Sequence, residues 1–372
     1  GVIVDKYTEK IQNQLLGLND SQREYWKNIR QPYAVIMELT PRCNMNCVHC
    51  YLQNSHKCEE LSYQHIVDIL DILCNKGILF ITFTGGEILT RKDFIDIYMY
   101  AKKKGFLIEL FTNGYLFTNE IISFLKEYPP LLVDVSLYGS CEETYKKITG
   151  ISGAFEIVLD NCKKLTSIGG RVALKSPIMT FTYQEIPKMK EIATNLHVPI
   201  RFNFEILSTI DKNNNTKEYQ IPLANIFQYE VEDYNSQIKK HSGFNYPRNH
   251  NKIFNCNVGL NSFVIDYEGN MCPCMKFRHR GKSLNKQNFD DIWKDFEKYS
   301  HLQATPNFWC NQCEASGYCD ICPAECEFLY GDMEYRTKKM CNLAKAKKVF
   351  YEEKSLEKAV SLLINNYKEV KI

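Results

Sequence analysis

The sequence predicts an α/β protein built as a partial, TIM-like (β/α)6 barrel, followed by a small cysteine-rich C-terminal domain. Two observations support this class. Six short apolar segments alternate with amphipathic helical segments over residues 34–206, which is typical of parallel strands joined by crossover helices. Nine of the 16 cysteines lie between Cys256 and Cys341. Six units are fewer than the eight of a closed TIM barrel, so we expect an open barrel.

Each unit of the barrel shows a strand pattern followed by a helix pattern. The expected strands are short apolar runs, and they cover 34–39, 78–84, 106–112, 133–137, 171–176 and 200–206. The expected helices have apolar residues three and four positions apart, and they cover 63–77, 93–105, 119–127, 153–168 and 185–195. The alternation stops after residue 206, so we expect the barrel to end there.

The rest of the chain divides by composition. The expected organisation is an N-terminal helical segment at 1–33, the barrel at 34–206, a linker or substrate-facing segment at 207–255, the cysteine-rich domain at 256–350 and a C-terminal helix at 351–372.

Composition excludes several classes of protein. The formal net charge of +2 gives no reason to expect nucleic-acid binding. No apolar run reaches about 18 residues, and no charged-then-apolar leader precedes the barrel, so we expect a cytoplasmic protein without a membrane span. Cysteines at this density in a cytoplasmic protein indicate metal or redox chemistry rather than disulfides.

The first cysteine motif follows the first expected strand directly. Cys43, Cys47 and Cys50 have the spacing C-x3-C-x2-C. Three thiolates on one short loop can hold three irons of a four-iron cluster and leave the fourth iron open to a small molecule. A zinc site with His49 as the fourth ligand is the alternative. The loop stands at the carboxyl end of a barrel strand, where the active sites of such folds are built.

A second motif, Thr84-Gly85-Gly86-Glu87, ends the second expected strand. Glycines permit a close backbone approach, and a carboxylate beside them can accept hydrogen bonds from an ammonium group. Together the two motifs resemble the signature of radical S-adenosylmethionine (SAM) enzymes. That resemblance implies a [4Fe-4S] cluster on the three cysteines and SAM as a cofactor. The residues that it implies for SAM binding are Gly85, Gly86, Glu87, Asn113, Ser136 and Lys175.

The C-terminal cysteines resemble the SPASM domain, which carries auxiliary iron–sulfur clusters in many radical SAM enzymes. The resemblance implies two further [4Fe-4S] clusters, three in all. The outer one would use Cys310, Cys313, Cys319 and Cys341. The inner one would use Cys256, Cys274 and Cys322, with Cys272, Cys326 or no residue as the fourth ligand. A zinc ribbon is the alternative, because its paired cysteines have the same spacing.

The segment SLYGSCEETYKKITGISGAFE, residues 136–156, resembles maturases of ribosomally made peptides. The implied reaction is reductive cleavage of SAM to a 5′-deoxyadenosyl radical, which abstracts hydrogen from a precursor peptide. A crosslink (thioether, carbon–carbon or carbon–oxygen) or an epimerisation would result. The implied partners are the peptide and a reductant such as flavodoxin or ferredoxin. Only 33 residues precede the first strand, so we expect the leader peptide to bind a separate protein or the enzyme's own surface.

Cys141 follows a turn at the end of the fourth expected strand, and we consider it a candidate catalytic residue at the active-site mouth. Packing is the other interpretation of this thiol. Three other functions remain open: maturation of a protein residue as in anaerobic sulfatase activation, a small-molecule reaction such as decarboxylation of a tetrapyrrole, and non-enzymatic binding of iron–sulfur clusters or zinc.

Overall fold

The computed structural model describes residues 28–53, 59–212, 216–237 and 251–364, together with Ser21, Tyr25 and Asn249. Most of the expected segment 1–33, and parts of 207–255 and 351–372, lie outside the described residues. Among the described helices, none combines the length and the apolar character that a membrane crossing requires.

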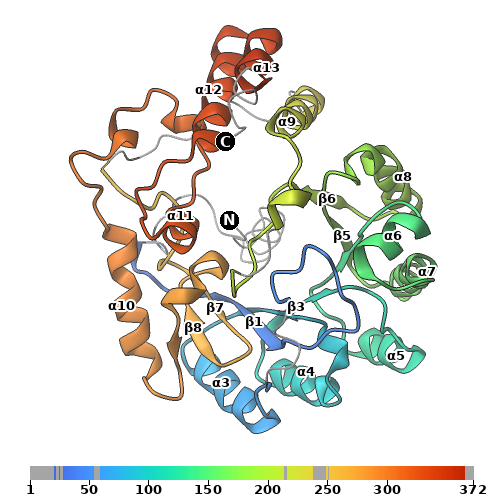
Figure 1. Cartoon of the computed structure of the whole chain (residues 1–372). Helices are drawn as coiled ribbons and strands as arrows, with labels where there is room; N and C mark the ends of the chain where they lie inside the picture. Colours follow the sequence, from blue (N-terminus) through green and yellow to red (C-terminus); the bar gives the residue numbers. More distant parts are fainter. Residues whose placement is uncertain are drawn as a thin grey trace.

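One sheet of nine strands organises the described part of the chain, in the order β6-β5-β4-β3-β2-β1-β7-β8-β9 (Figure 1). The first six strands pair in parallel, which confirms the predicted α/β class with a partial barrel. These strands are β1 (Ala34–Thr40), β2 (Phe80–Gly85), β3 (Leu107–Thr112), β4 (Leu132–Ser136), β5 (Val172–Pro177) and β6 (Ile200–Asn203).

Crossover helices cover the outside of this sheet (Figure 1). They are α3 (Tyr63–Asn75), α4 (Phe94–Lys103), α5 (Asn119–Glu127), α7 (Ala154–Ser167) and α8 (Ile186–Leu196). Side-chain caps begin two of them: Ser62 accepts a hydrogen bond from the His65 N–H, and Thr118 accepts one from the Ile121 N–H. Each predicted helix is therefore present, with ends shifted by one or two residues. A further helix, α6 (Glu142–Thr149), was not predicted.

The C-terminal region extends the barrel sheet. Strand β7 (Ser262–Ile265) pairs in parallel with β1, so Val35 lies opposite Phe263, and β8 (Asn270–Cys272) and β9 (Lys282–Ser283) follow in antiparallel pairing. The short run SFVI is apolar enough to be buried against β1, which explains why it continues the sheet. The cysteine-rich region thus shares a hydrogen-bonded edge with the barrel.

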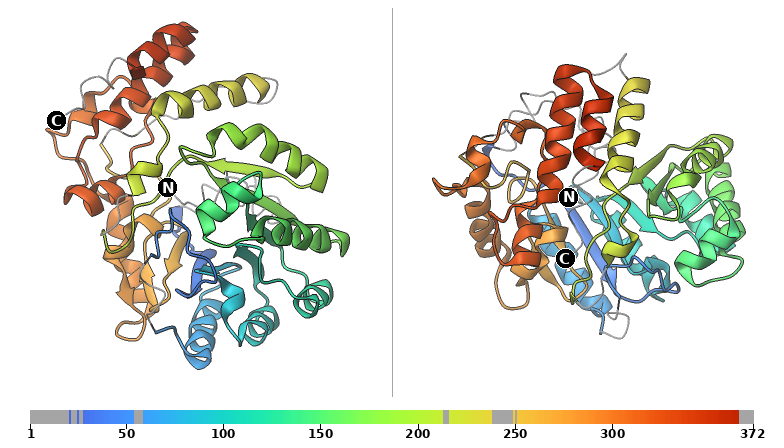
Figure 2. Two further views of the ribbon diagram at one scale, coloured as in Figure 1. Left: turned by 45° about the vertical axis from the view of Figure 1, so that its right-hand side comes forward. Right: turned by 45° about the horizontal axis from the view of Figure 1, so that its top comes forward.

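The remaining elements of the C-terminal half are all helical. They are α9 (Leu223–Gln237), the 3-10 helix η5 (Met275–Arg280), α10 (Phe289–His301), η6 (Trp309–Gln312), η7 (Ser316–Tyr318), α11 (Pro323–Tyr330), α12 (Lys338–Glu353) and α13 (Leu356–Ile364). Helix α9 lies where the sequence predicted only a linker. It packs beside α12 and α13 (Figure 2).

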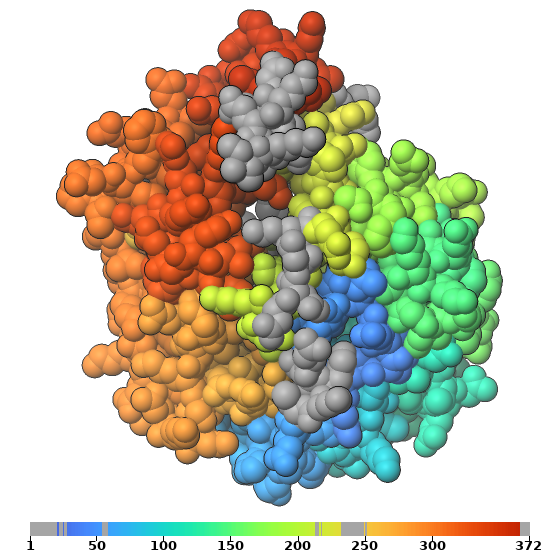
Figure 3. Space-filling model, in the orientation of Figure 1, coloured from blue at the N-terminus to red at the C-terminus, as the bar shows by residue number. Residues whose placement is uncertain are grey.

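The segment 204–212, which follows β6, lies between the two halves of the molecule. In the space-filling view it appears yellow-green, with the orange C-terminal region on one side and the blue loop after β1 on the other (Figure 3). The Ile210 N–H donates to the Tyr51 carbonyl at 3.1 Å, which links this segment to the loop. The carboxyl ends of the barrel strands and the C-terminal region therefore face each other across this segment.

Candidate active site

The cysteine loop after β1 is held by backbone hydrogen bonds from the end of α6. The Asn46 N–H donates to the Thr149 carbonyl at 3.0 Å, and the Val48 N–H donates to the Ile148 carbonyl at 3.0 Å. These carbonyls are available because a helix leaves its last carbonyls without intrahelical partners. The unpredicted helix α6 thus has a clear role, which is to hold the loop that carries Cys47.

The three thiols of this loop lie close enough to influence one another. The pKa of Cys43 is raised to about 12, chiefly by burial, with Glu87 and the Cys50 thiol acting in the same direction. Burial also raises the pKa of Cys47, with Cys50 and Cys43 acting in the same direction. The Met45 N–H points at the Cys43 sulfur at 3.4 Å. Thiols in such a setting deprotonate when a metal binds them.

Gly85 and Gly86 make room for the backbone of this loop. A Cβ on Gly85, whose φ is +138°, would lie 2.3 Å from the Thr40 carbonyl oxygen, and one on Gly86 would lie 2.2 Å from the Arg42 carbonyl oxygen. The Gly86 N–H donates to Thr40 and the Glu87 N–H donates to Arg42, each at 2.8 Å. The glycines therefore position the cysteine loop, a role that the sequence alone did not suggest.

Glu87 is fully buried and links this loop to the end of β3. Its carboxylate accepts hydrogen bonds from the Thr112 hydroxyl at 2.9 Å, the Asn113 N–H at 2.7 Å and the Leu89 N–H at 3.1 Å. Burial raises the pKa of Glu87, and these hydrogen bonds act in the opposite direction. The carboxylate thus orients Asn113 directly.

Asn113 in turn reaches the cysteine loop. Its side-chain amide donates to the Asn44 side-chain oxygen at 2.8 Å and points at the Cys43 sulfur at 3.7 Å. Its own oxygen accepts from the Tyr115 N–H at 3.0 Å. The Glu87–Asn113–Cys43 chain brings two predicted SAM-site residues and one predicted cluster ligand together.

Ser136 and Lys175 lie opposite each other at the ends of β4 and β5. The Lys175 ammonium is 3.5 Å from the Asp134 carboxylate and 3.4 Å from the centre of the Phe111 ring. Asp134 is fully buried and also pairs with Arg201 of β6. Burial raises the pKa of Asp134 to about 6, while Lys175 acts in the opposite direction. The barrel interior is therefore strongly charged beside the cysteine loop.

Two buried polar atoms in the loop have no hydrogen-bond partner among the described residues. They are the Asn44 side-chain nitrogen and the Nδ1 atom of His49. Such atoms are rare in folded proteins and indicate a missing group or water. With three thiols and a strand-end carboxylate network beside them, the residues present fit an iron–sulfur cluster with a small polar ligand.

The predicted inner cysteines also come together. Burial raises the pKa of Cys274 to about 12, with Cys322 and Cys256 adding to the rise. Cys326 is buried on α11, one turn after Cys322, and burial and the Cys322 thiol raise its pKa to about 12. Cys326 therefore lies beside Cys322, as its helical spacing predicted, and the predicted outer ligand Cys310 also acts on its pKa.

Cys272 is placed differently. It is fully buried in an apolar cluster with Ile36, Val264 and Met275. Its sulfur lies 3.5 Å from the Asn270 carbonyl oxygen and 3.8 Å from that of Arg278. Strand β8 ends at Cys272, and after Pro273 the chain turns into η5. Beyond burial, the pKa of Cys272 is affected mainly by Asp266, Arg278 and Glu38 and least by Cys274, whereas that of Cys274 is affected by Cys322 and Cys256.

Three of the four predicted outer cysteines lie in or at the end of short 3-10 helices, and the fourth lies in a long α-helix. Cys310 is in η6, Cys313 and Cys319 end η6 and η7, and Cys341 is in α12. Burial raises the pKa of Cys341, with Arg336 opposing and Cys313 adding to the rise. Within the described residues, no three His, Cys, Asp or Glu side chains form a ready site for a single metal ion.

Cys141 is exposed at the N-terminus of α6, so it is not a packing residue. Its thiol points at the Thr144 hydroxyl at 3.5 Å, and the Ser140 hydroxyl donates to Glu185 at 2.8 Å close by. Its hydrogen-bond partner Thr144 belongs to α6 and not to the cysteine loop. Its catalytic role stays a prediction.

One buried network was not predicted. Glu38 of β1 is fully buried, and it accepts hydrogen bonds from the Tyr51 hydroxyl at 2.7 Å and from Arg278 of η5 at 2.5 Å. A single acid inside the apolar run AVIMEL was the signal available in the sequence. This network joins the barrel, the cysteine loop and the C-terminal region.

Comparisons with known proteins agree with this arrangement. Residues 37–194 match the model of the radical SAM superfamily, and residues 256–323 match that of the iron–sulfur cluster-binding SPASM domain. The antilisterial bacteriocin subtilosin biosynthesis protein AlbA of Bacillus subtilis is 26% identical over 331 residues, which cover 84% of this chain and 71% of that protein.

Two other similarities differ in extent. The Fe-coproporphyrin III synthase of Methanosarcina barkeri is 34% identical over 168 residues. This match covers 45% of this chain and 42% of that protein, so the chain spans less than half of its length. The crystal structure of Streptococcus suis SuiB bound to precursor peptide SuiA has the same fold. It superposes with a TM-score of 0.67 at 16% identity and covers 90% of this chain and 80% of that one.

Proposed function

We propose, from the premise that this chain is a radical SAM enzyme with a SPASM domain, that it modifies a residue of a ribosomally made precursor peptide. The observation that carries the proposal is the extent of the similarity to the subtilosin biosynthesis protein, which spans the barrel and the C-terminal region alike. The product would be a thioether, carbon–carbon or carbon–oxygen crosslink, or an epimerised residue.

The proposed cofactors give the cysteine loop and the residues around it distinct roles. Cys43, Cys47 and Cys50 would hold the cluster that binds SAM. With one electron from an external reductant such as flavodoxin or ferredoxin, bound SAM supplies methionine and a 5′-deoxyadenosyl radical, which takes a hydrogen atom from the substrate. The chain's own contribution is to orient these groups and to exclude water.

The residues around the cysteine loop would orient the bound cluster and SAM. Glu87 holds the Asn113 backbone at 2.7 Å, and the Asn113 amide lies against Asn44 and Cys43. We infer that the polar atoms of Asn44 and His49 without partners among the described residues face the bound group. Lys175 lies near the carboxyl end of β5, where its ammonium, 3.5 Å from the Asp134 carboxylate, would meet an anionic part of a ligand.

The SPASM region would hold two auxiliary clusters. For the inner one, the placement of Cys326 beside Cys322 favours it over Cys272 as the fourth ligand of Cys256, Cys274 and Cys322. The outer one would use Cys310, Cys313, Cys319 and Cys341. Three clusters together correspond to about twelve irons per chain.

The test is to incubate the anaerobically reconstituted protein with SAM, dithionite and short peptides encoded near its gene. We expect 5′-deoxyadenosine, and a peptide that has lost two hydrogen atoms or contains a D-residue. A peptide-independent reaction that changes a tetrapyrrole would favour the second candidate function, for which the 34% identity to the Fe-coproporphyrin III synthase is the supporting observation. Conversion of a serine or cysteine in a sulfatase peptide would favour the anaerobic sulfatase alternative.

A further inference from the structure

We propose that the free edge of strand β6 binds an extended segment of the substrate peptide as an additional strand of the sheet, through the main chain of the peptide. This feature is called the β6 edge below and comprises residues 200–203. The inference rests on the proposed function, because it says how the same active site would hold its peptide.

The sheet ends at β6 on one side and at β9 on the other (Figure 1). Strand β9 has only two residues, and its Lys282 pairs with Asp295 of α10 at 2.9 Å. Short strands and lysine side chains protect an edge from pairing with another chain. Strand β6 has four residues, and all of them are half-buried or exposed. It is therefore the edge that is more open to an added strand.

The main-chain hydrogen bonds between β5 and β6 show which groups of β6 face outward. The Ile178 N–H, just after β5, donates to the Asn203 carbonyl at 2.8 Å. Successive residues of a strand direct their N–H and C=O groups to opposite sides, so those of Ile200 and Phe202 point away from β5. Within the described part of the chain, these outward groups have no hydrogen-bond partner.

Contacts with two helices and with a later loop fix the position of the β6 edge. The centre of the Phe202 ring lies 5.9 Å from that of Tyr229 of α9 and 6.0 Å from the Lys190 ammonium of α8. Just after the strand, the Phe204 carbonyl accepts a hydrogen bond from the Gln220 side chain at 2.6 Å. A strand that is already held in place loses less entropy when it binds a partner.

The β6 edge continues a row of paired residues that includes two predicted SAM-site residues. Ser136 of β4 lies opposite Lys175 of β5, and Lys175 lies opposite Arg201 of β6. Paired residues of neighbouring strands direct their side chains to the same face of the sheet, and an added strand lies about 4.8 Å away. A peptide residue opposite Arg201 would therefore direct its side chain to the face that carries Ser136 and Lys175.

Recognition by the β6 edge depends on the main chain rather than on charge. Arg201, the cation of this strand, contacts the Asp134 carboxylate. A peptide that adds a strand gains affinity from its N–H and C=O groups, and its side chains face the two sides of the sheet alternately. The register of the peptide would therefore decide which of its residues the 5′-deoxyadenosyl radical reaches.

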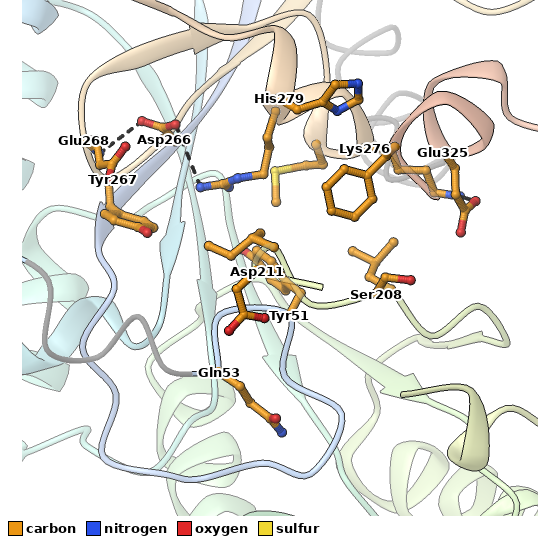
Figure 4. Close-up of a pocket in the computed structure, with 15 residues that line it drawn as sticks. Tyr51, Gln53, Ser208, Asp211, Asp266, Tyr267, Glu268, Lys276, His279 and Glu325 are labelled. Atoms are coloured by element: carbon orange, nitrogen blue, oxygen red, sulfur yellow. Dashed lines mark hydrogen bonds and ion pairs between the residues drawn. The ribbon is translucent and has the colours of Figure 1, made fainter. Parts of the chain in front are cut away.

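A cavity of about 480 Å³ beside the end of the cysteine loop is less suited to this role. The charged side chains of its lining have partners within the chain, such as Arg278 with Asp266 (Figure 4). At its margin, the Lys212 ammonium lies 4.4 Å from the centre of the Phe328 ring. A charged peptide side chain would compete with these contacts, whereas a peptide strand on the β6 edge would displace no hydrogen bond among the described residues.

The first test is hydrogen exchange with residue resolution. The probe is the tightest binder that the anaerobically reconstituted full chain selects from a displayed library of short random peptides. In the free chain we expect fast exchange at Ile200 and Phe202 and slow exchange at Arg201 and Asn203, whose amides face β5. The bound peptide should slow exchange at Ile200 and Phe202 by about tenfold or more.

The second test changes the peptide and leaves the chain intact. N-methylation removes one peptide N–H at a time, and only every second residue of an added strand directs its N–H to β6. Methylation should therefore weaken binding about tenfold at alternate peptide positions and leave it unchanged at the positions between them.

A matched pair of variants tests the same N–H from the side of the chain. Phe202→Pro removes an outward N–H of the edge strand and should weaken peptide binding about tenfold. Phe202→Ala removes the same ring but keeps the N–H, so it should bind the peptide as the wild type does. If Phe202→Pro does not fold, the methylated peptides decide the question.

Several results would overturn the proposal. They are slow exchange at Ile200 and Phe202 in the free chain, unchanged exchange when the peptide binds, methylation effects that do not alternate, failure of the wild type to select any peptide, and equal binding by folded Phe202→Pro and Phe202→Ala.

SAM cleavage by the wild type separates this inference from the proposed function. If 5′-deoxyadenosine forms and a peptide is modified while exchange at Ile200 and Phe202 stays unchanged, the β6 edge proposal fails and the proposed function stands. If the wild type neither cleaves SAM nor modifies any peptide, the proposed function fails regardless of where peptides bind.

Discussion

The cysteine loop after β1 and the cysteines of the C-terminal region are held in different ways. Backbone hydrogen bonds from α6 and from the Gly86 and Glu87 amides hold the loop on both sides. Around the outer cysteines, the backbone hydrogen bonds among the described residues are local: the Cys313 N–H donates to the Cys310 carbonyl, and the Cys319 N–H donates to the Ser316 carbonyl. The first site is therefore built by the barrel itself, whereas the second depends more on the metal that it binds.

The seam between these regions carries charge. Arg278 reaches from η5 to Glu38 inside the barrel, and Lys276 reaches from the same helix to Glu205 after β6. Burying such pairs is costly unless both partners are present. We infer that these ion pairs fix the position of the C-terminal region relative to the barrel.

The largest effect is expected at the cysteine loop. Replacing Cys43, Cys47 and Cys50 together by alanine removes every predicted ligand of the first cluster, so SAM cleavage should be lost. The auxiliary clusters should remain, and iron content should fall by about four of about twelve irons. Chromatography of 5′-deoxyadenosine and iron analysis measure both. Residual 5′-deoxyadenosine under dithionite would contradict the assignment.

The next prediction distinguishes Cys326 from Cys272 as the fourth ligand of the inner cluster. Cys326→Ala should cost up to about four irons, because its thiol lies beside Cys322. Cys272→Ala is the matched control and should keep its iron, because that thiol is buried in an apolar cluster. Iron and sulfide analysis with electron paramagnetic resonance measures the outcome. Loss of iron from Cys272→Ala alone would reverse the assignment.

The contribution of the buried Arg278–Glu38 pair to stability is tested by removing one of its two charges. Arg278→Met leaves Glu38 buried without its cation and should lower the free energy of unfolding by about 3–5 kcal/mol. The side chain of Arg278 is 13% exposed, whereas that of Arg280, which pairs with Glu327, is 50% exposed. Arg280→Met is therefore the control, with an expected cost below about 1 kcal/mol.

A double variant completes this test. Glu38→Gln combined with Arg278→Met removes both charges, so it should be more stable than Arg278→Met alone. Denaturant unfolding under anaerobic conditions measures all four proteins. Equal costs for Arg278→Met and Arg280→Met would show that the seam does not depend on the buried pair.

The charged interior of the barrel should respond to pH. The pKa of Asp134 is raised from 3.8 to about 6, so between these values the folded protein binds the extra proton. This contribution to the free energy of unfolding is present at low pH and is lost as pH rises through about 6, with an upper limit of about 3 kcal/mol. Lys175 and Arg201 face this carboxylate.

Asp134→Asn isolates the effect of this carboxylate. Because the wild type loses this contribution as the pH rises through the interval from 3.8 to about 6, the free energy of unfolding of the variant relative to that of the wild type should rise by up to about 3 kcal/mol between about pH 3.5 and about pH 7.5. Thermal unfolding across this range measures the difference between the two proteins. Parallel pH curves for the wild type and the variant would rule out Asp134 as the responsible group.

The smallest expected effect concerns Glu87. Glu87→Ala removes hydrogen bonds to Thr112 and Asn113, so Asn113 should lose its orientation toward Cys43. We expect SAM affinity to fall by about one to two decades, which corresponds to roughly 1.5–3 kcal/mol. Glu87→Gln keeps most of the hydrogen bonds and should lose less. Isothermal titration gives the dissociation constants, and an unchanged value for Glu87→Ala would remove Glu87 from the site.

Local patterns in the sequence determined the barrel. Apolar runs and helical spacing located six strands and five helices, because these signals depend on neighbouring residues. The same holds for the motif at Cys43, Cys47 and Cys50, whose three members lie within eight residues of one loop. The short helix α6 was missed because its residues, EETYKKIT, are mostly polar and lack a long apolar stripe.

Only the tertiary structure decided how the distant parts meet. Strand β7 joins β1 across more than 200 residues of chain, and that pairing brings Arg278 to Glu38. Spacing alone could not separate Cys272 from Cys326, because both lie within reach of the inner cysteines along the chain. The turn at Pro273 and the helix after Cys322 direct the two thiols to different surroundings, and these directions depend on packing between segments rather than on local sequence.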